Sequence, residues 1–399
     1  MNPLRRLPTR KLLALIAGVI VLAGSISAVA VAALTGGGPV PAAKSLAAAI
    51  HDALLGPKIE GITANIQFTN NLIDSSSIPN STPLLKGASG RLWASNDGRL
   101  RLELQSSRGD TEVMIAPGSF SVFDVAGNTV YRGTLPAHKA SAGAEPAHQP
   151  PTLKTITDAI NSVMAKVGVS KANPTDIGGA PAYSITFSPK HDGGLLGKAE
   201  LAFDSVNGAP LRFAVYAQGN PSPVLELTAT NVSFGAVASG DLTVAPPSNA
   251  KIVEISQPSG PVGAAKAHKG TAAKETTGAT RVAAALPFRL DAPAKLAGLP
   301  QTSVRLLSFG KQPAAVVTYG QHLGAIVVIE RQADPAKAGK PAGGSSESSP
   351  LPTVSINGAT GTELATALGT GLMFDRAGVS YIVLGSVPPA AAEAAARGL

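Results

Sequence analysis

The sequence contains no cysteine, which excludes disulfides, Cys-ligated zinc, iron–sulfur clusters and thiol nucleophiles. Aromatic residues are also scarce at 4%, and charged residues make up only 15% of the 399 residues. Hydrophobic residues nevertheless reach 44%, so the chain can build sizeable cores and is not disordered as a whole. Its length predicts about two to three globular units. Its 43 glycines and 32 prolines indicate turn-rich β-structure and linkers.

Basic residues outnumber acidic ones, but the net charge of +8 is local. The excess lies within residues 5–11 and again within residues 266–281, and elsewhere the two signs nearly balance. No basic face with interleaved aromatic residues is present. We therefore expect no nucleic-acid partner.

Only one apolar run, Leu12–Leu34, has the length of about 20 residues that crosses a bilayer as a helix. Because basic residues precede it, residues 1–35 are predicted to be a transmembrane anchor or a signal segment. A cleaved signal fits the small-x-small site at Ala28-Val29-Ala30, whereas the length favours a retained anchor. We expect a single-pass cell-membrane protein, held through residues 12–34, with its C-terminal bulk outside the cytoplasm. Cleavage would instead leave it periplasmic or secreted.

Residues 42–256 are expected to form one unit. Apolar residues at helical spacing predict a short helix over residues 42–55 and a stronger one over residues 152–167. Elsewhere apolar and polar residues alternate in short segments separated by turn signals such as Asn96-Asp97-Gly98. This pattern predicts an antiparallel meander that forms one wide sheet, with two helices available to cover it.

Residues 257–281 have too few large apolar side chains to order themselves and are predicted to be a flexible linker. Residues 282–399 are expected to form a small α+β domain, interrupted by a second linker over residues 334–350. Its predicted strands lie near residues 287–290, 303–308, 314–319, 325–329, 353–356 and 381–387, and its predicted helices near Glu363 and residues 389–397.

Motifs that carry catalysis or bind metals are missing from the sequence. The six histidines are scattered, no H-E-x-x-H pair occurs, and no G-x-S-x-G elbow occurs. Gly193–Lys198 lacks the spacing of a phosphate-binding loop, and Asp204–Gly208 lacks the ligand series of a calcium loop, so both are predicted to be turns. We therefore expect a protein that is not an enzyme and that holds no metal or cofactor.

A wide sheet with one strongly apolar face must cover that face. The two helices either complete an ordinary packed core or leave room in a curled sheet for an acyl chain, whose methylenes each stabilise binding by about 0.8 kcal/mol. Composition alone favours the packed core.

Four short segments resemble the core of LolA-type lipoprotein carriers, which run G-x-L-W, a strand with R-x-E, and then a tyrosine-rich strand that ends in Asn. The matching segments are Gly90–Ser95, Arg99–Glu103, Val122–Asp124 and Asn128–Tyr131. The order helix, long strand, meander, helix, meander is similar too, over about residues 42–250. Where the carriers have an arginine after the tryptophan strand this chain has Ser95 and Asn96, and Pro117-Gly118 replaces their Asp-Gly turn. The stretch from Phe374 to Ser386, with the alanine-rich helix after it, resembles the C-terminal domains of exported regulators of the MucB/RseB kind.

The resemblance implies an α+β fold, an unclosed antiparallel β-barrel with a helical lid, followed by the small C-terminal α+β domain. It also implies a hydrophobic cavity that holds lipid or lipoprotein acyl chains. The candidate lipid-binding residues are Ile62, Ile66, Phe68, Leu100, Leu102, Leu104, Ile185, Phe187 and Phe213, with Trp93 at the rim.

Two non-catalytic functions follow from this resemblance. The first is extracytoplasmic binding of lipid or lipoprotein acyl chains by a membrane-anchored protein of bacterial type. The alternative is an envelope-stress regulatory module of the MucB/RseB kind, which binds an anti-sigma factor or another membrane protein through its C-terminal domain.

Overall fold

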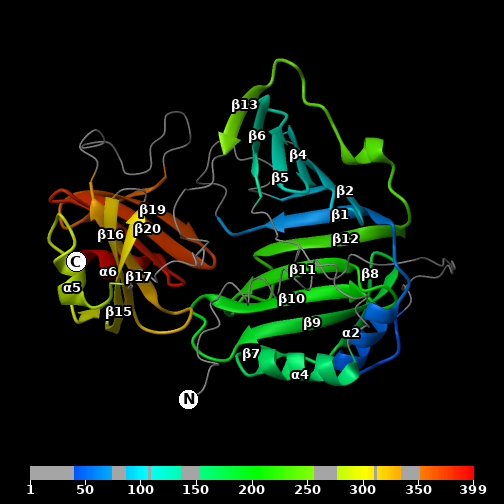
Figure 1. Cartoon of the computed structure of the whole chain (residues 1–399), viewed down its shortest axis with the longest axis horizontal. Helices are drawn as coiled ribbons and strands as arrows, with labels where there is room; N and C mark the ends of the chain where they lie inside the picture. The colour runs from blue at the N-terminus through cyan, green and yellow to red at the C-terminus, as the bar shows by residue number, and fades with distance from the viewer. Residues whose placement is uncertain are drawn as a thin grey trace, which may run out of the picture.

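The computed structural model, drawn in Figure 1, is rich in β-structure and has few helices among the residues it describes. It describes residues 40–73, 87–106, 109–135, 152–255, 276–309, 312–333 and 351–399. The predicted membrane segment at residues 12–34 and most of the two predicted linkers lie outside the described residues. Within the described ranges, no helix combines the length and the apolar character needed to cross a membrane.

The larger sheet has 13 strands in the order β13-β6-β5-β4-β3-β2-β1-β12-β11-β10-β9-β7, with β8 paired to β9. Its strands are β1 Gly61–Asn70, β2 Ala88–Ser95, β3 Leu100–Ser106, β4 Gly109–Ala116, β5 Ser119–Asp124, β6 Thr129–Thr134, β7 Val167–Val169, β8 Asn173–Ile177, β9 Ala180–Pro189, β10 Leu196–Asp204, β11 Pro210–Ala217, β12 Leu225–Phe234 and β13 Lys251–Ile255. Neighbouring strands are antiparallel as predicted, except that β13 runs parallel to β6. Strands β7, β8 and β13 were not predicted, because they are short or pair with segments remote in sequence.

Apolar and polar side chains alternate along the strands, so this sheet has one apolar face and one polar face. We call inner the face that carries Ile62, Ala64, Ile66 and Phe68 of β1, and outer the opposite face. Residues directly opposite each other on antiparallel strands share a face. The register therefore extends the inner face from Ala64 through Leu92, Leu102, Val113 and Val122.

Two helices lie on the inner face at the β9 end of the sheet, as Figure 1 shows. Helix α2 (Leu46–Leu55) begins at the N-cap Ser45, whose Oγ accepts the Ala48 backbone N–H, and α4 (Leu153–Met164) begins at Thr152. On α2 the small residues Ala49 and Ala53 are buried against Tyr183, Ile185 and Phe203 of the sheet. Helix α4 buries only Ile156. The helices therefore cover one end of the inner face and not its whole width.

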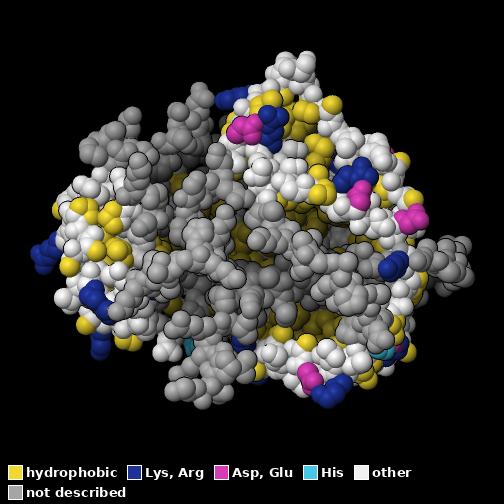
Figure 2. All heavy atoms as spheres, in the orientation of Figure 1, with side chains coloured by type: hydrophobic (Ala, Val, Ile, Leu, Met, Phe, Trp, Pro, Cys, Tyr) yellow, Lys and Arg dark blue, Asp and Glu magenta, His cyan; other side chains and the backbone are white. Residues whose placement is uncertain are grey.

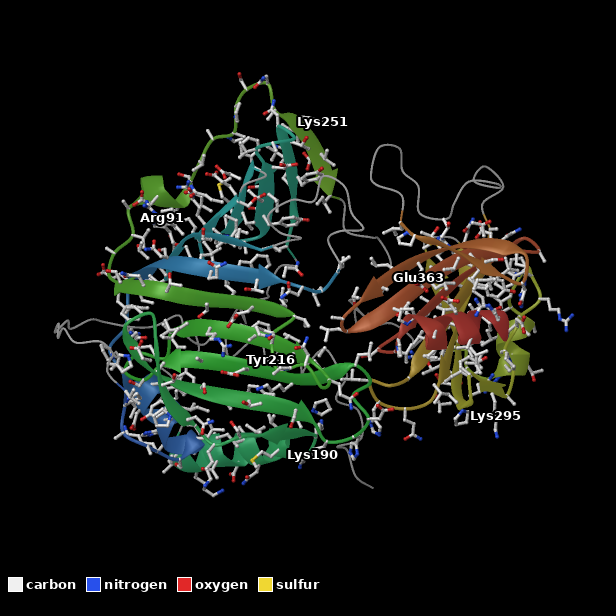
Figure 3. The ribbon with its side chains drawn as sticks, turned by 180° about the vertical axis from the view of Figure 1, so that it is seen from behind. Arg91, Lys190, Tyr216, Lys251, Lys295 and Glu363 are labelled. Atoms are coloured by element: carbon white, nitrogen blue, oxygen red, sulfur yellow. The ribbon has the colours of Figure 1, made fainter. Side chains whose placement is uncertain are left out.

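The outer face is partly covered by the chain that leads from β12 to β13. The 3-10 helix η2 (Ser239–Leu242) buries Leu242, which is 3% exposed, near β2 and β3. Farther along, the Val244 N–H lies 3.5 Å from the sulfur of Met114 on β4. Figure 3, which views the molecule from behind, labels Arg91 and Tyr216 of this face.

The smaller sheet has eight strands in the order β14-β15-β16-β17-β21-β20-β19-β18. Its elements are α5 Ala279–Ala283, β14 Lys295–Leu296, β15 Leu299–Phe309, β16 Gln312–Tyr319, β17 Ile326–Gln332, β18 Thr353–Ile356, β19 Ala359–Thr366, β20 Gly369–Arg376, β21 Val379–Gly385 and α6 Pro389–Arg397. One buried cluster, which includes Val317, Val328, Phe374 and Val383, forms its core against α6. Residues 276–281, predicted to end the linker, are ordered against β15, where the Gly278 N–H donates to the Val304 carbonyl. The predicted domain boundaries themselves stay predictions.

Two predictions for the smaller sheet are wrong. Residues 287–290 form no strand, although Phe288 and Leu290 pack against the core as alternating residues of a strand would. Glu363 lies in strand β19 and not in a helix. Three consecutive residues, Gly361–Glu363, are buried there. Buried and exposed residues therefore do not alternate along β19, and the sequence lacks the period of two that predicts a strand.

The two sheets touch through loops. The Leu195 N–H, in the turn between β9 and β10, lies 3.1 Å from the carbonyl oxygen of Ser386 and 3.0 Å from its Oγ. The rings of His191 and His322 stack beside this contact with their centroids 4.5 Å apart. A second contact joins the Ala367 N–H to the Leu72 carbonyl at 2.7 Å.

Candidate functional site

The inner face brings together nine of the ten predicted lipid-binding residues. One cross-strand row contains Ile185, Phe213 and Phe68, linked through Leu201 and Leu227. Neighbouring rows place the remaining members on the same face, and these are Ile62, Ile66, Leu100, Leu102, Leu104 and Phe187. The sequence pattern thus located an apolar surface, and its role in binding lipid stays a prediction.

Trp93 is the exception, because the register places it on the outer face opposite Thr63 and Arg101. It is 8% exposed, and the Arg101 guanidinium lies 4.7 Å from its ring centroid. Arg101 is held in turn by Glu112, at 2.9 Å, and by Glu103, at 3.3 Å. Trp93 is therefore a packed side chain of the outer face and not part of the inner surface.

Coverage of the inner face is uneven. Leu104, Ile66 and Ile185 are at most 4% exposed. The other predicted members of the inner face are only half-buried, and so are Leu92, Val113 and Val122 on strands β2, β4 and β5. In Figure 2, hydrophobic side chains are visible in the recess at the height of β1 and β12 and again near β9 and β10. A strip of aliphatic and aromatic side chains therefore runs across the sheet, and the described elements cover it only in part.

Among the described strands, polar side chains gather on the inner face at the end formed by β4, β5 and β6, and Asn70 and Ser106 lie on the same face at the ends of β1 and β3. At β4, β5 and β6 the register continues from Leu104 to Thr111, Asp124 and Thr129. The Thr111 hydroxyl is buried without a hydrogen-bond partner in the part of the chain that the structure describes. No charged side chain occupies the rows that pass through Leu92 or Phe213 among the described strands. These two rows offer apolar contact, so they suit non-covalent binding of hydrocarbon.

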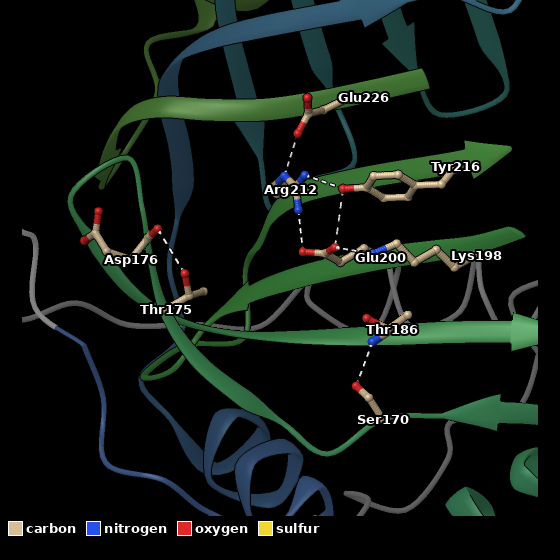
Figure 4. A network of polar contacts seen from close by, with 9 residues as sticks. All are labelled: Ser170, Thr175, Asp176, Thr186, Lys198, Glu200, Arg212, Tyr216 and Glu226. Atoms are coloured by element: carbon tan, nitrogen blue, oxygen red, sulfur yellow. Dashed lines mark hydrogen bonds and ion pairs between the residues drawn. The ribbon is translucent and has the colours of Figure 1, made fainter. Parts of the chain in front are cut away.

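The outer face carries a polar network that sequence reasoning missed (Figure 4). Arg212 on β11 donates from Nε to Glu226 at 2.6 Å, from Nη1 to Glu200, and from Nη2 to the Tyr216 hydroxyl at 2.9 Å. Lys198 Nζ lies 4.3 Å from the Tyr216 ring centroid. Burial by itself would lower the pKa of Arg212, but the hydrogen bonds to Tyr216 and Glu226 and both carboxylate charges raise it above its usual value. The network joins β10, β11 and β12 and is a structural feature of the sheet.

The sequence Asp204–Gly208 forms the predicted turn between β10 and β11. Oδ1 of Asp204 accepts the backbone N–H groups of Val206 and Asn207, both at 2.9 Å. Asp204 is 2% exposed, and burial raises its pKa although these two hydrogen bonds lower it. The Asp204 carboxylate therefore stabilises the turn by accepting its backbone N–H groups. Among the described residues, no group of three or more His, Asp or Glu side chains could hold a metal ion.

No protein-family model and no curated protein matches the sequence. Several solved structures are similar to this chain. A chain of the MucA/MucB complex from Pseudomonas aeruginosa is 14% identical, with 88% of this chain and 94% of that chain covered and a TM-score of 0.38. An uncharacterized conserved protein from Thermus thermophilus is 12% identical, over 49% of this chain and 90% of that one, with a TM-score of 0.31.

A putative outer membrane lipoprotein-sorting protein domain from Vibrio parahaemolyticus is 10% identical, over 46% of this chain and 88% of that one, with a TM-score of 0.19. Further matched structures are of MucB, alone and in complex with MucA. The proteins that this chain is similar to thus include MucB and a lipoprotein-sorting domain, the two groups that its sequence resembles.

Proposed function

We propose that the protein binds lipid or lipoprotein acyl chains without catalysis, in contact with the inner face of its larger sheet. In this proposal residues 12–34 anchor the chain in the cell membrane, and the two sheets lie outside the cytoplasm. A membrane-anchored protein would then meet its ligand at the bilayer surface.

One observation carries the proposal, namely the incomplete cover of the aliphatic strip on the inner face. In a packed core, side chains such as Leu102 and Val113 would be buried on all sides, yet both are half-buried. Each methylene that moves from water onto this strip contributes about 0.8 kcal/mol to binding. Binding to the strip is therefore strongest for a long hydrocarbon chain that lies across several strands.

Native mass spectrometry of the full chain, purified from its own membrane, tests this proposal. We expect bound mass that matches a lipid or an acylated peptide. Consistently bare protein would contradict the proposal. It would favour the alternative of a regulatory module that binds a membrane protein partner.

A pair of charge substitutions locates the ligand. Leu102→Glu places a carboxylate on the inner strip, where a hydrocarbon chain would have to desolvate it, so we expect at least about a tenfold loss of bound lipid. Ser89→Glu adds the same charge on the adjacent strand β2, where Ser89 is exposed on the outer face. That control should keep its lipid. Equal loss in both variants would mean that the effect does not come from the inner strip.

A further inference from the structure

A second groove lies on the outer face, beneath the chain that leads from η2 to β13. Two adjoining cavities of about 660 Å³ and 230 Å³ occupy it, and both are lined by Met114, Ser121 and Arg132. The larger one reaches the ends of β4 and β5 at Ile115 and Phe120, and the smaller one continues below Val244. A cavity of several hundred cubic ångströms with mostly apolar walls and a few polar groups is what small-molecule sites share.

The apolar wall of the two cavities comes from two separate parts of the chain. Met114 and Phe123 belong to the outer face of the sheet, and Leu242 and Val244 belong to the chain that crosses it. Glu254 of β13 lines the larger cavity and its side chain is 60% exposed, so the groove is open to solvent on the β13 side.

Two arginines line the same cavity, and each uses only part of its guanidinium. Arg132 Nε lies 2.7 Å from an oxygen of Glu254, and Arg99 Nε lies 2.7 Å from an oxygen of Asp97. Within the described segments, the Nη groups of these two arginines have no hydrogen-bond partner. Arg212 shows that one guanidinium can bind two anions at once, because it donates to one carboxylate through Nε and to another through Nη1. Arg99 and Arg132 therefore each keep a free edge for a second anion.

From these observations we propose that the outer groove binds a single-chain anionic amphiphile. The anionic group would lie against the Nη groups of Arg132, and the alkyl chain would lie along Met114 and beneath Leu242, towards the opposite end of the larger cavity, where Arg99 lies. Met114, Ser121 and Arg132 are opposite one another on three adjacent strands. They span about 10 Å at the usual strand spacing, so a chain of several methylenes can follow the row. A cationic or uncharged amphiphile would leave the free edge of the Arg132 guanidinium without a partner.

Photoaffinity labelling of the full chain with a diazirine-bearing palmitate tests this site. Crosslinks to Leu242 and Thr243 identify the outer groove, because that segment lies on the outer face, whereas crosslinks to Leu102 or Val113 report the inner strip. The two proposals can therefore fail independently. We expect labelling of residues 242–243, and the corresponding alkyl alcohol, which lacks the charge, should label them at least about tenfold less.

Substitutions at the ion pair between Arg132 and Glu254 then show whether Arg132 binds an anion or only supports the structure. Arg132→Gln should reduce labelling of residues 242–243 at least about tenfold, whereas Glu254→Gln removes the competing carboxylate and should increase it. Arg91→Gln, which removes an exposed arginine of the same face outside this groove, should change nothing. Ser121→Trp, which fills the groove, should abolish the label. No labelling of residues 242–243, equal labelling by the alcohol, or losses of the same size in Arg132→Gln and Glu254→Gln would overturn the proposal.

Discussion

Replacing Glu330 with glutamine is expected to remove most of the pH dependence of the stability of the smaller sheet between about pH 4.5 and 7. Glu330 lies on β17, between Ala315 on β16 and Tyr381 on β21, and is 0% exposed. Its Oε2 accepts the Asp291 backbone N–H at 2.9 Å, whereas Oε1 has no partner in the described part of the chain. A charged carboxylate in this place is therefore poorly compensated.

Burial raises the pKa of Glu330 to about 7, and the negative charge of Asp291 adds to the rise, although the hydrogen bond from the Asp291 backbone opposes it. The folded state then holds the proton more tightly than the unfolded state, where the pKa is near 4.5. The stabilisation is present in full below about pH 4.5 and is lost as the pH rises through 7. A difference of this size changes the free energy of unfolding by about 3 kcal/mol over that range.

Hydrogen exchange at the amides of β16, β17 and β21, measured between pH 5 and 8.5 and corrected for the intrinsic rate, reports this stability locally. In the wild type the local free energy of opening should fall as the pH rises, and in Glu330→Gln it should stay nearly level. Glu393→Gln removes a carboxylate that is bound to Arg397 on α6, and serves as the matched control. A Glu330→Gln variant with the wild-type slope would show that another group is responsible.

The elements that follow one simple period were predictable from the sequence. The strand predicted at residues 353–356 and the helix predicted at residues 389–397 match β18 and α6 residue for residue. Strand β1 alternates clearly because one of its faces is apolar and the other polar. Residues 287–290 show why pattern alone is insufficient, since Phe288 packs into the core as in a strand although no neighbouring strand pairs with it.

For the candidate site, the sequence located the apolar face but not the partners across strands. The G-x-L-W match placed Trp93 beside Leu92 in sequence, yet adjacent strand residues point to opposite faces, so the tryptophan lies on the outer side. Arg212, Glu200 and Glu226 are separated by turns and each alternates with apolar neighbours. Only the register shows that the three side chains meet. The outer groove likewise depends on where the chain after η2 crosses the sheet, which no local pattern encodes.

Arg212→Met is expected to destabilise the larger sheet by about 3 kcal/mol, because it leaves Glu226 without its cation and Glu200 with only Lys198, whose Nζ lies 4.0 Å from Oε2 of Glu200. The Arg212, Glu200 and Glu226 side chains are each 17% exposed, so water compensates them only in part. Tyr216 would also lose the Arg212 Nη2 donor. Urea unfolding, followed by the fluorescence of the single tryptophan in this same sheet, measures the change.

Two causes could lower the stability of Arg212→Met, namely the missing positive charge and the lost packing around the aliphatic part of the arginine side chain. Further variants separate them. Arg212→Lys keeps the positive charge but lacks the forked guanidinium that reaches both carboxylates. Its free energy of unfolding should therefore lie between those of the wild type and Arg212→Met. If repulsion between Glu200 and Glu226 is the main cost, a variant that also carries Glu200→Gln and Glu226→Gln should recover the stability that Arg212→Met loses. A loss that survives the triple substitution would assign the effect to packing alone. Because Phe213 follows Arg212 directly and lies on the inner strip, recovery of the charge balance should also restore any acyl binding that Arg212→Met weakens.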